Sequence, residues 1–363
     1  MTMLQRIQKC ACVALLFTPV VVGLEKPGTV YKVFQFPADQ IPRVDDKTND
    51  WDVVPEDYVI GMDQLTDSNN NLKHDSKDID VKVKVGWVKG LNRLFFLYEA
   101  WDDYWSFARP DQHNDMFEVA VDGNLSGGPF IKDLHPETRL DPWNMYRATQ
   151  GVHAQNWHVF TPAEGKDWVM VWGCQQPWIR ELPYGNAAYS YNFKHGGSGK
   201  LVLEFWLTPF DHADCDRGPG YSVESNLTEN KIIGLAWAVK DYDDDSENAK
   251  AFWNLSPKVT MYGNASDLVA FRLMPLEARF RKPIEAKWSF KILDVDRKLV
   301  AFQDLSEGNI TSWTWDFGDG TTSDDRHPIH QYRTGGEYRT VTLYVEGPAG
   351  KARRAKVFDV VLP

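Results

Sequence analysis

The chain has 363 residues, which is long enough for two or three domains that each bury a core. Its apolar content of 43% and charged content of 25% are ordinary for a globular protein and exclude wholesale disorder. The 51 acidic residues outnumber the 40 basic ones, the net charge is −11, and no basic stripe stands out. We therefore expect no nucleic-acid partner and no attraction to anionic membrane surfaces.

The first 23 residues have the layout of a signal peptide. Arg6 and Lys9 precede a short apolar run from Ala11 to Val22. That run is too short to span a bilayer, and no later segment approaches eighteen consecutive apolar residues. We expect residues 1–23 to be removed and the mature chain to be secreted, periplasmic or held at the cell surface, with no membrane span.

The remainder of the chain is dominated by short segments in which apolar and polar residues alternate, as in half-buried strands. Glycine, asparagine and proline turns separate these segments, and no long helical stripe is found. The expected strands are Val81–Val85, Leu94–Ala100, Met116–Asp122, Trp168–Trp172, Leu201–Leu207, Ile232–Val239 and Leu268–Leu273. The pattern predicts an all-β protein whose first domain, residues 24–278, is a two-sheet antiparallel sandwich.

Residues 124–199 differ from this pattern, because they contain few clear strands and many aromatic, proline, glycine and asparagine residues. We expect long loop insertions here, and such loops on a rigid sheet scaffold commonly carry the binding surface. Cys174 and Cys215 are the two cysteines of the expected mature chain. In an oxidising compartment they could form one disulfide, and two isolated thiols remain an equal alternative.

A polar, proline-containing link after Met274 precedes a second domain, residues 279–363. Its landmarks are Trp315-Asp316-Phe317-Gly318-Asp319-Gly320, His330-x-Tyr332 and the strand Val341–Val345. Gly318 and Gly320 suit tight turns, and aspartate side chains can accept hydrogen bonds from nearby backbone amides. The segment resembles a PKD domain (polycystic kidney disease repeat), which implies an immunoglobulin-like sandwich. We favour a spacer role for it over direct contact with polysaccharide or protein through exposed aromatic residues.

Three segments of the first domain, in their order along the chain, resemble a family 9 carbohydrate-binding module, within the wider DOMON-like group of sandwiches. They are the aromatic strand of Trp87–Asp103, the sequence Asn114-Asp115-Met116-Phe117-Glu118, and the run from Gly234 to Asp244 followed by Phe252-Trp253-Asn254. The resemblance implies that a sugar is clamped between two tryptophan rings while charged residues bind its hydroxyl groups.

Carried over by position, the resemblance makes Trp253 one clamp residue, Glu118 the acidic strand residue, and Arg147 and Asp241 further ligand contacts. The second clamp tryptophan has no match near Gln112, so another aromatic residue would have to replace it. The candidates on or beside predicted loops are Trp105, Trp143, Trp157 and Trp178.

Acidic residues gather at Asp241–Asp245 and at Asp102-Asp103. Carboxylate oxygens are the ligands that Ca²⁺ prefers, and the related family often binds this ion. We therefore assign Asp243, Asp244 and Asp102 to a structural Ca²⁺ site, with solvated acidic loops as the alternative. No organic cofactor is predicted.

These observations favour an exported, noncatalytic carbohydrate-binding protein with a PKD spacer. One alternative is a glycan-active lyase or hydrolase that uses the long insertion, which contains His135, His153 and His158, although no spacing identifies an acid–base pair. A second alternative is a haem-binding DOMON-like protein, and a third is a purely structural surface protein.

Overall fold

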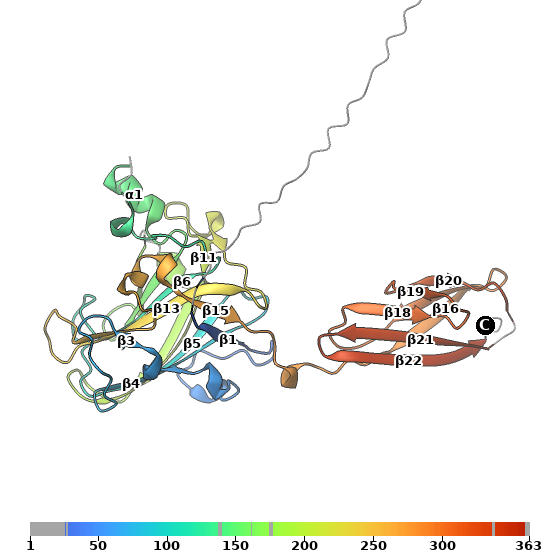
Figure 1. Cartoon of the computed structure of the whole chain (residues 1–363), viewed down its shortest axis with the longest axis horizontal. Helices are drawn as coiled ribbons and strands as arrows, with labels where there is room; N and C mark the ends of the chain where they lie inside the picture. Colours follow the sequence, from blue (N-terminus) through green and yellow to red (C-terminus); the bar gives the residue numbers. More distant parts are fainter. Residues whose placement is uncertain are drawn as a thin grey trace, which may run out of the picture. The chain divides into compact units, whose positions relative to one another are not determined.

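The computed structural model describes residue 26 and residues 28–136, 140–160, 162–173, 177–335 and 338–359. The expected signal peptide, residues 1–23, lies outside the described residues. The chain divides into two compact units, the first ending at Met274 and the second beginning at Pro275, and each is described by itself (Figure 1). No helix in the described part of the chain is both long enough and apolar enough to cross a membrane.

Thirteen strands of the first unit form two sheets that are joined at one strand, β1 (Val30–Gln35). The first half of β1 pairs in parallel with β15, and Phe34 and Gln35 pair in parallel with β4. The first sheet contains β8 (Val169–Val171), β7 (Gln155–Phe160), β6 (Met116–Asp122), β13 (Ile232–Asp241), β15 (Val269–Leu273), β14 (Ala251–Asn254) and β3 (Thr66–Asp67). The second sheet contains β4 (Ile79–Trp87), β5 (Leu94–Asp102), β10 (Gly199–Leu207), β9 (Gly185–Tyr191) and β2 (Ile60–Gly61).

The hydrophobic core of this unit lies between the two sheets. Every second residue of a strand points into it, since side chains alternate between the two faces. On β5 the inward row is Leu94, Phe96, Tyr98 and Ala100, and on β13 it includes Trp237 and Val239. The prediction of an all-β, two-sheet sandwich is confirmed, with the addition that β1 pairs in parallel on both of its sides.

Residues 124–199 contain more regular structure than the sequence suggested. Strands β7 and β8 extend the first sheet, β9 extends the second, and an eight-residue helix, α1 (Pro142–Thr149), precedes β7 in the chain. Asp141 caps this helix by accepting hydrogen bonds from the backbone amides of Trp143 and Asn144, and Pro142 occupies its first turn. In β7 the polar residues Asn156 and His158 alternate with Trp157 and Val159, which point into the core.

The connections of the first unit also contain a two-stranded ribbon, β11 (Phe210–His212) with β12 (Val223–Glu224). Short 3-10 helices occur at η1 (Thr48–Trp51), η2 (Glu56–Tyr58), η3 (Met62–Gln64), η4 (Lys132–Leu134), η5 (Pro177–Arg180), η6 (Pro219–Tyr221), η7 (Val259–Tyr262), η8 (Ala265–Asp267) and, in the second unit, η9 (Ala278–Phe280).

The second unit is a smaller antiparallel sandwich with its own core. One sheet has three strands, β16 (Trp288–Asp294), β17 (Leu299–Asp304) and β20 (Ile329–Gln331). The other has four strands, β19 (Thr322–Ser323), β18 (Ser312–Asp316), β21 (Tyr338–Gly347) and β22 (Gly350–Asp359). Trp288, Phe302, Trp315 and Leu343 are buried between the two sheets.

The turn after β18 uses the residues that the sequence motif singled out. Gly318 has φ +73°, and a Cβ there would lie 2.6 Å from the carbonyl oxygen of Thr340. Asp316 Oδ1 accepts a hydrogen bond from the amide of Gly318 at 2.9 Å, and Asp319 Oδ1 accepts one from that of Thr321 at 3.0 Å. Backbone and side chain therefore specify the same turn, as the motif predicted.

We expect Trp315→Ala to destabilise the second unit by about 3–5 kcal/mol, which is the usual cost of emptying a buried tryptophan site. Trp315 has no exposed surface, and its ring centroid lies 5.6 Å from that of Trp288 and 5.4 Å from that of Phe302. Calorimetry of the full chain checks this, with Tyr338→Ala as the control because that side chain is 75% exposed. Equal melting of the two variants would contradict the core position of Trp315.

Candidate functional site

The outer face of the first sheet, opposite the core, carries a row of polar and aromatic side chains. Glu118 of β6 is paired in register with His158 of β7 on one side and with Ala238 of β13 on the other. Lys240 of β13 is paired with Phe252 of β14. Because strand residues alternate between faces, these side chains share the outer face, while Phe117, Trp157 and Val239 point into the core.

These side chains line an open cavity between the sheet and the surrounding loops. Ala236 and Ala238 lie on the same outer face, but they are buried in a separate hydrophobic cluster with Phe130, Met261 and Leu268 and do not line this cavity. The lining combines aromatic rings with groups that donate and accept hydrogen bonds: Ser68, Asn69, Gln112, Glu118, His158, Trp172, Lys240, Tyr242, Glu247, Asn248, Ala249, Phe252, Val259 and Tyr262.

Glu118 is the electrostatic centre of this cavity. Its Oε1 accepts a hydrogen bond from Asn156 Nδ2 at 2.6 Å and lies 3.2 Å from His158 Nε2. Burial alone would raise the pKa of Glu118, but the attraction and hydrogen bond of His158, the charge of Lys240 and the Asn156 amide lower it to about 2. Glu118 therefore stabilises the fold above its ordinary pKa, and this contribution is lost as the pH falls toward 2.

The structure corrects the assignment of Trp253 as a sugar clamp. Trp253 is paired with Val239, points into the core and is 2% exposed, and its Nε1 donates to Asp241 Oδ2 at 3.4 Å. The neighbouring residue, Phe252, faces the cavity instead. A shift of one residue along a strand reverses the face, so the aromatic residue on the cavity side of this strand is Phe252.

Two other tryptophan candidates are also in the core. Trp105 is 1% exposed and stacks on Phe193 with ring centroids 4.5 Å apart, and Trp157 is 1% exposed as well. Neither presents a face to a ligand.

Trp143 is exposed and Arg147 is half-buried, but neither lines the cavity around Glu118. Both belong to α1 and line a separate cavity with Lys132, Pro142, Tyr146, Cys215 and Asp216. Arg147 forms an ion pair with Asp216. Arg147 and Glu118, which were both predicted to contact the ligand, therefore line different cavities.

A second constellation lies at one end of the sandwich and consists of Asp102, Asp115 and Asp241. Each continues the inward row of its strand, β5, β6 and β13 respectively, beyond the last apolar residue. All three are at most 2% exposed, and one ligand oxygen of each lies within 4.8 Å of the others. Asp115 is fully hydrogen-bonded, because Oδ2 accepts from the Ser106 amide at 2.6 Å and Oδ1 from the Tyr242 amide at 2.8 Å.

One oxygen each of Asp102 and Asp241, namely Asp102 Oδ2 and Asp241 Oδ1, is buried without a hydrogen-bond partner among the described residues, and so is Oδ1 of the nearby Asp243. Burial and then the charge of Asp241 raise the pKa of Asp102 to about 8. Burial and then the charge of Asp243 raise the pKa of Asp241 to about 7. A cation at this position would compensate the repulsion between carboxylates that adds to the effect of burial in both shifts.

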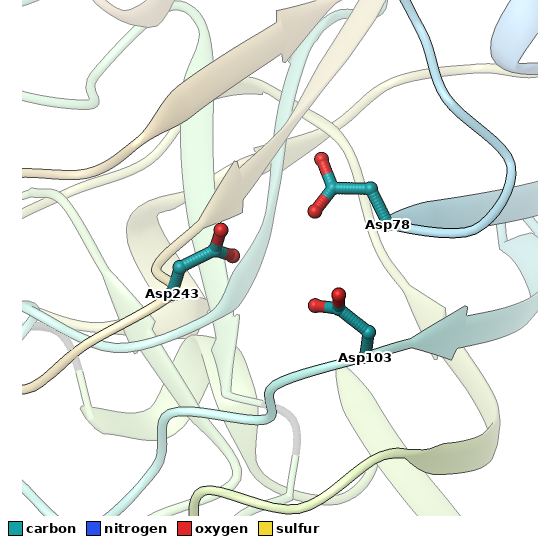
Figure 2. A group of neighbouring side chains, drawn as sticks. All are labelled: Asp78, Asp103 and Asp243. Carbon is teal, nitrogen blue, oxygen red and sulfur yellow. The ribbon is translucent and has the colours of Figure 1, made fainter.

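A more exposed group, Asp78, Asp103 and Asp243, borders the buried one, and Figure 2 shows its three carboxyl groups pointing toward one another. Here Lys250 forms ion pairs with both Asp78 and Asp243, so a cation already balances this group. Of the predicted metal ligands, Asp102 and Asp243 belong to the two groups, whereas Asp244 belongs to neither.

One of the two cysteines of the predicted disulfide is among the described residues. Cys215 is disulfide-bonded. Cys174, the expected partner, lies outside the described residues.

The sequence analysis missed Lys240, Phe252 and Asp115 as site residues, and it named His158 only for a catalytic alternative. The signal that could have found them is strand parity. Glu118 and Lys240 sit on the opposite parity from the core rows of their strands, and Asp115 sits on the core parity two residues before Phe117.

Known proteins resemble each unit. A family 9 carbohydrate-binding module from Caldicellulosiruptor kristjanssonii, solved with cellotriose, aligns with 71% of this chain and 100% of its own at 13% identity and TM-score 0.45. Collagenase ColQ1 of Bacillus cereus (strain Q1) is 42% identical over 50 residues, which is 14% of this chain. This chain thus spans only 5% of that curated relative.

The second unit has the clearer match. The PKD1 domain of the Vibrio cholerae metalloprotease PrtV aligns at 28% identity with 22% of this chain and 96% of its own, with TM-score 0.20 over the full chain. The PKD domain family model matches residues 297–362. Residues 297–362 are therefore a PKD domain, as the Trp315–Gly320 motif predicted.

Proposed function

We propose that this chain is an exported carbohydrate-binding protein in which the cavity around Glu118 holds a sugar and the PKD domain acts as a spacer. The observation that carries this proposal is the composition of that cavity. An aromatic ring, Phe252, lies beside a cation, Lys240, with Lys240 Nζ 5.8 Å from the ring centroid, and an ionised carboxylate stands nearby. A pyranose has apolar C–H faces that stack on aromatic rings, and hydroxyl groups that need charged donors and acceptors.

The low pKa of Glu118 favours a role in sugar binding over a role in cleaving a glycosidic bond. A general acid needs a raised pKa so that it can protonate the leaving group near neutral pH. The pKa of Glu118 is instead lowered to about 2, against the effect of its burial, by His158, Lys240 and Asn156. An ionised carboxylate that accepts hydrogen bonds suits recognition of sugar hydroxyls.

We expect Lys240→Met to weaken binding to the retained sugar roughly 10- to 150-fold, because a charged hydrogen bond contributes roughly 1.5–3 kcal/mol. Titration calorimetry with cello-oligosaccharides, xylo-oligosaccharides, manno-oligosaccharides and malto-oligosaccharides provides the measurement, with product release assayed in parallel. Lys89→Met is the matched control, since the Lys89 side chain is 58% exposed and does not line the cavity. Because the pKa of Glu118 is about 2, affinity at pH 4 should stay close to that at pH 7. Binding by neither protein, or release of products, would argue against the proposal.

We also propose that Asp102, Asp115, Asp241 and Asp243 bind a structural Ca²⁺. Oxygens that share one Ca²⁺ lie within about 5 Å of each other, since each bond is 2.3–2.6 Å long. The oxygens of the buried group meet this condition within 4.8 Å. Three buried, unpartnered carboxylate oxygens fit a hard cation, because leaving them ionised and uncompensated would be costly. The ion would supply positive charge that ties the ends of both sheets together.

A further inference from the structure

The cavity on α1 offers an aromatic surface that the proposed sugar site does not use. The Trp143 side chain is 64% exposed, and its ring is nearly parallel to that of Tyr146, at an interplanar angle of 9° with centroids 6.0 Å apart. The two residues are three apart on the helix, so they share one face of it. The exposed tryptophan ring offers an apolar face on which the C–H groups of a sugar ring can stack.

The surface is rigidly held. Tyr146 donates a hydrogen bond from its hydroxyl to the Gly173 carbonyl at 2.6 Å, and Met145 anchors the buried side of the helix. Asp141 caps the helix, and the disulfide-bonded Cys215 lines the same cavity. A fixed aromatic surface binds with a smaller entropy cost than a mobile one.

Polar groups surround the rings in a balanced arrangement. Each cation of the lining has an anionic partner, because Arg147 pairs with Asp216, and Lys132 Nζ lies 3.6 Å from Asp133 Oδ1, which is itself outside the lining. These side chains supply both donors and acceptors at the edge of the rings. A neutral site of this kind matches a neutral polyhydroxylated ring better than a polyanion.

The size of the apolar surface argues against a protein partner. A stable protein interface needs about 1,000 Å² or more with an apolar centre. Within residues 140–150, Leu140 and Trp143 are the large hydrophobic side chains that are exposed, and charged residues border them. Two aromatic rings with hydrogen-bonding groups at their edge match the footprint of one or two sugar units.

We propose that Trp143 and Tyr146 form a second carbohydrate-contact site, for pyranose units within a neutral polysaccharide chain, separate from the cavity around Glu118. The two cavities share no lining residue. This inference rests on the proposed function of the chain as a carbohydrate-binding protein. Two sites on one molecule raise the apparent affinity for a polymer through effective concentration, without changing the affinity of either site for a short sugar.

The test is gel retardation and pull-down of the full chain on cellulose, xylan, β-mannan, mixed-linkage β-glucan and starch, together with calorimetry on the matching trisaccharides. We expect Trp143→Ala to weaken retention by the best polymer at least tenfold while the trisaccharide affinity at the Glu118 cavity stays within twofold. Trp143→Phe should restore part of the retention, and the melting temperature of each variant should match that of the unchanged chain.

Leu182→Ala is the control, because Leu182 is 72% exposed and lines neither cavity. Unchanged retention of Trp143→Ala, with retention still lost in Phe252→Ala, would overturn the second site and leave the proposed function standing. Loss in Trp143→Ala but not in Phe252→Ala would support the second site and contradict the first. No retention of the unchanged chain by any of the five polymers would overturn both.

Discussion

Removing Ca²⁺ with a chelator is expected to lower the melting temperature of the first unit by about 5 to 10 °C. Saturation at one hundred times the dissociation constant adds about 2.7 kcal/mol to the stability of the folded state. For a unit of this size, each kcal/mol corresponds to roughly 2–4 °C. Differential scanning calorimetry in 1 mM CaCl₂ and in 1 mM EDTA measures the shift directly. A first unit that melts at the same temperature in both solutions would remove the metal proposal.

Two variants sharpen this experiment. Asp241→Asn should abolish the Ca²⁺ response and, in EDTA, melt no lower than the unchanged chain, because it removes one of three mutually repelling buried charges. Asp244→Asn should retain the full response, since Asp244 is exposed and lies outside both acidic groups. A lost response in Asp244→Asn would restore the assignment made from the sequence.

Phe252→Ala is expected to weaken sugar binding at least tenfold with little change in stability. Trp253→Ala should instead lower the stability of the first unit while changing the sugar affinity little. Phe252 lines the cavity and is only partly buried. Trp253 is 2% exposed in the core, where truncation costs about 3–5 kcal/mol. Titration calorimetry and urea unfolding on the two neighbouring variants separate the roles.

Trp253→Phe keeps most of the core volume and therefore serves as the control for indirect effects. It should bind sugar as the unchanged chain does, with a smaller loss of stability than Trp253→Ala. If Trp253→Phe lost binding while remaining folded, and Phe252→Ala bound normally, the clamp role would return to Trp253.

The sequence predicted the architecture well where the signal is local. The alternation in Val81–Val85 identified β4 because a half-buried strand must repeat with period 2, and the largely apolar run Met116–Asp122 identified β6, which is buried on both faces. The Trp315–Gly320 motif identified the PKD domain, since its glycines and aspartates define one turn through contacts no more than a few residues apart. Residues 124–199 were predicted less well. Strand β7 was not predicted, although Asn156 and His158 alternate there with the core residues Trp157 and Val159.

The candidate site depended on pairings that no local pattern contains. The sequence by itself determined that an acidic, aromatic-rich β-sandwich precedes a PKD domain, and it selected Glu118 and Asp102. Only the tertiary structure decided that β14 pairs with β13 in the register that turns Phe252 outward and Trp253 inward. It also brought Asp102, Asp115 and Asp241 together from three strands and kept Arg147 away from Glu118. Strand parity is a local property, whereas register and the meeting of strand ends are set by long-range packing.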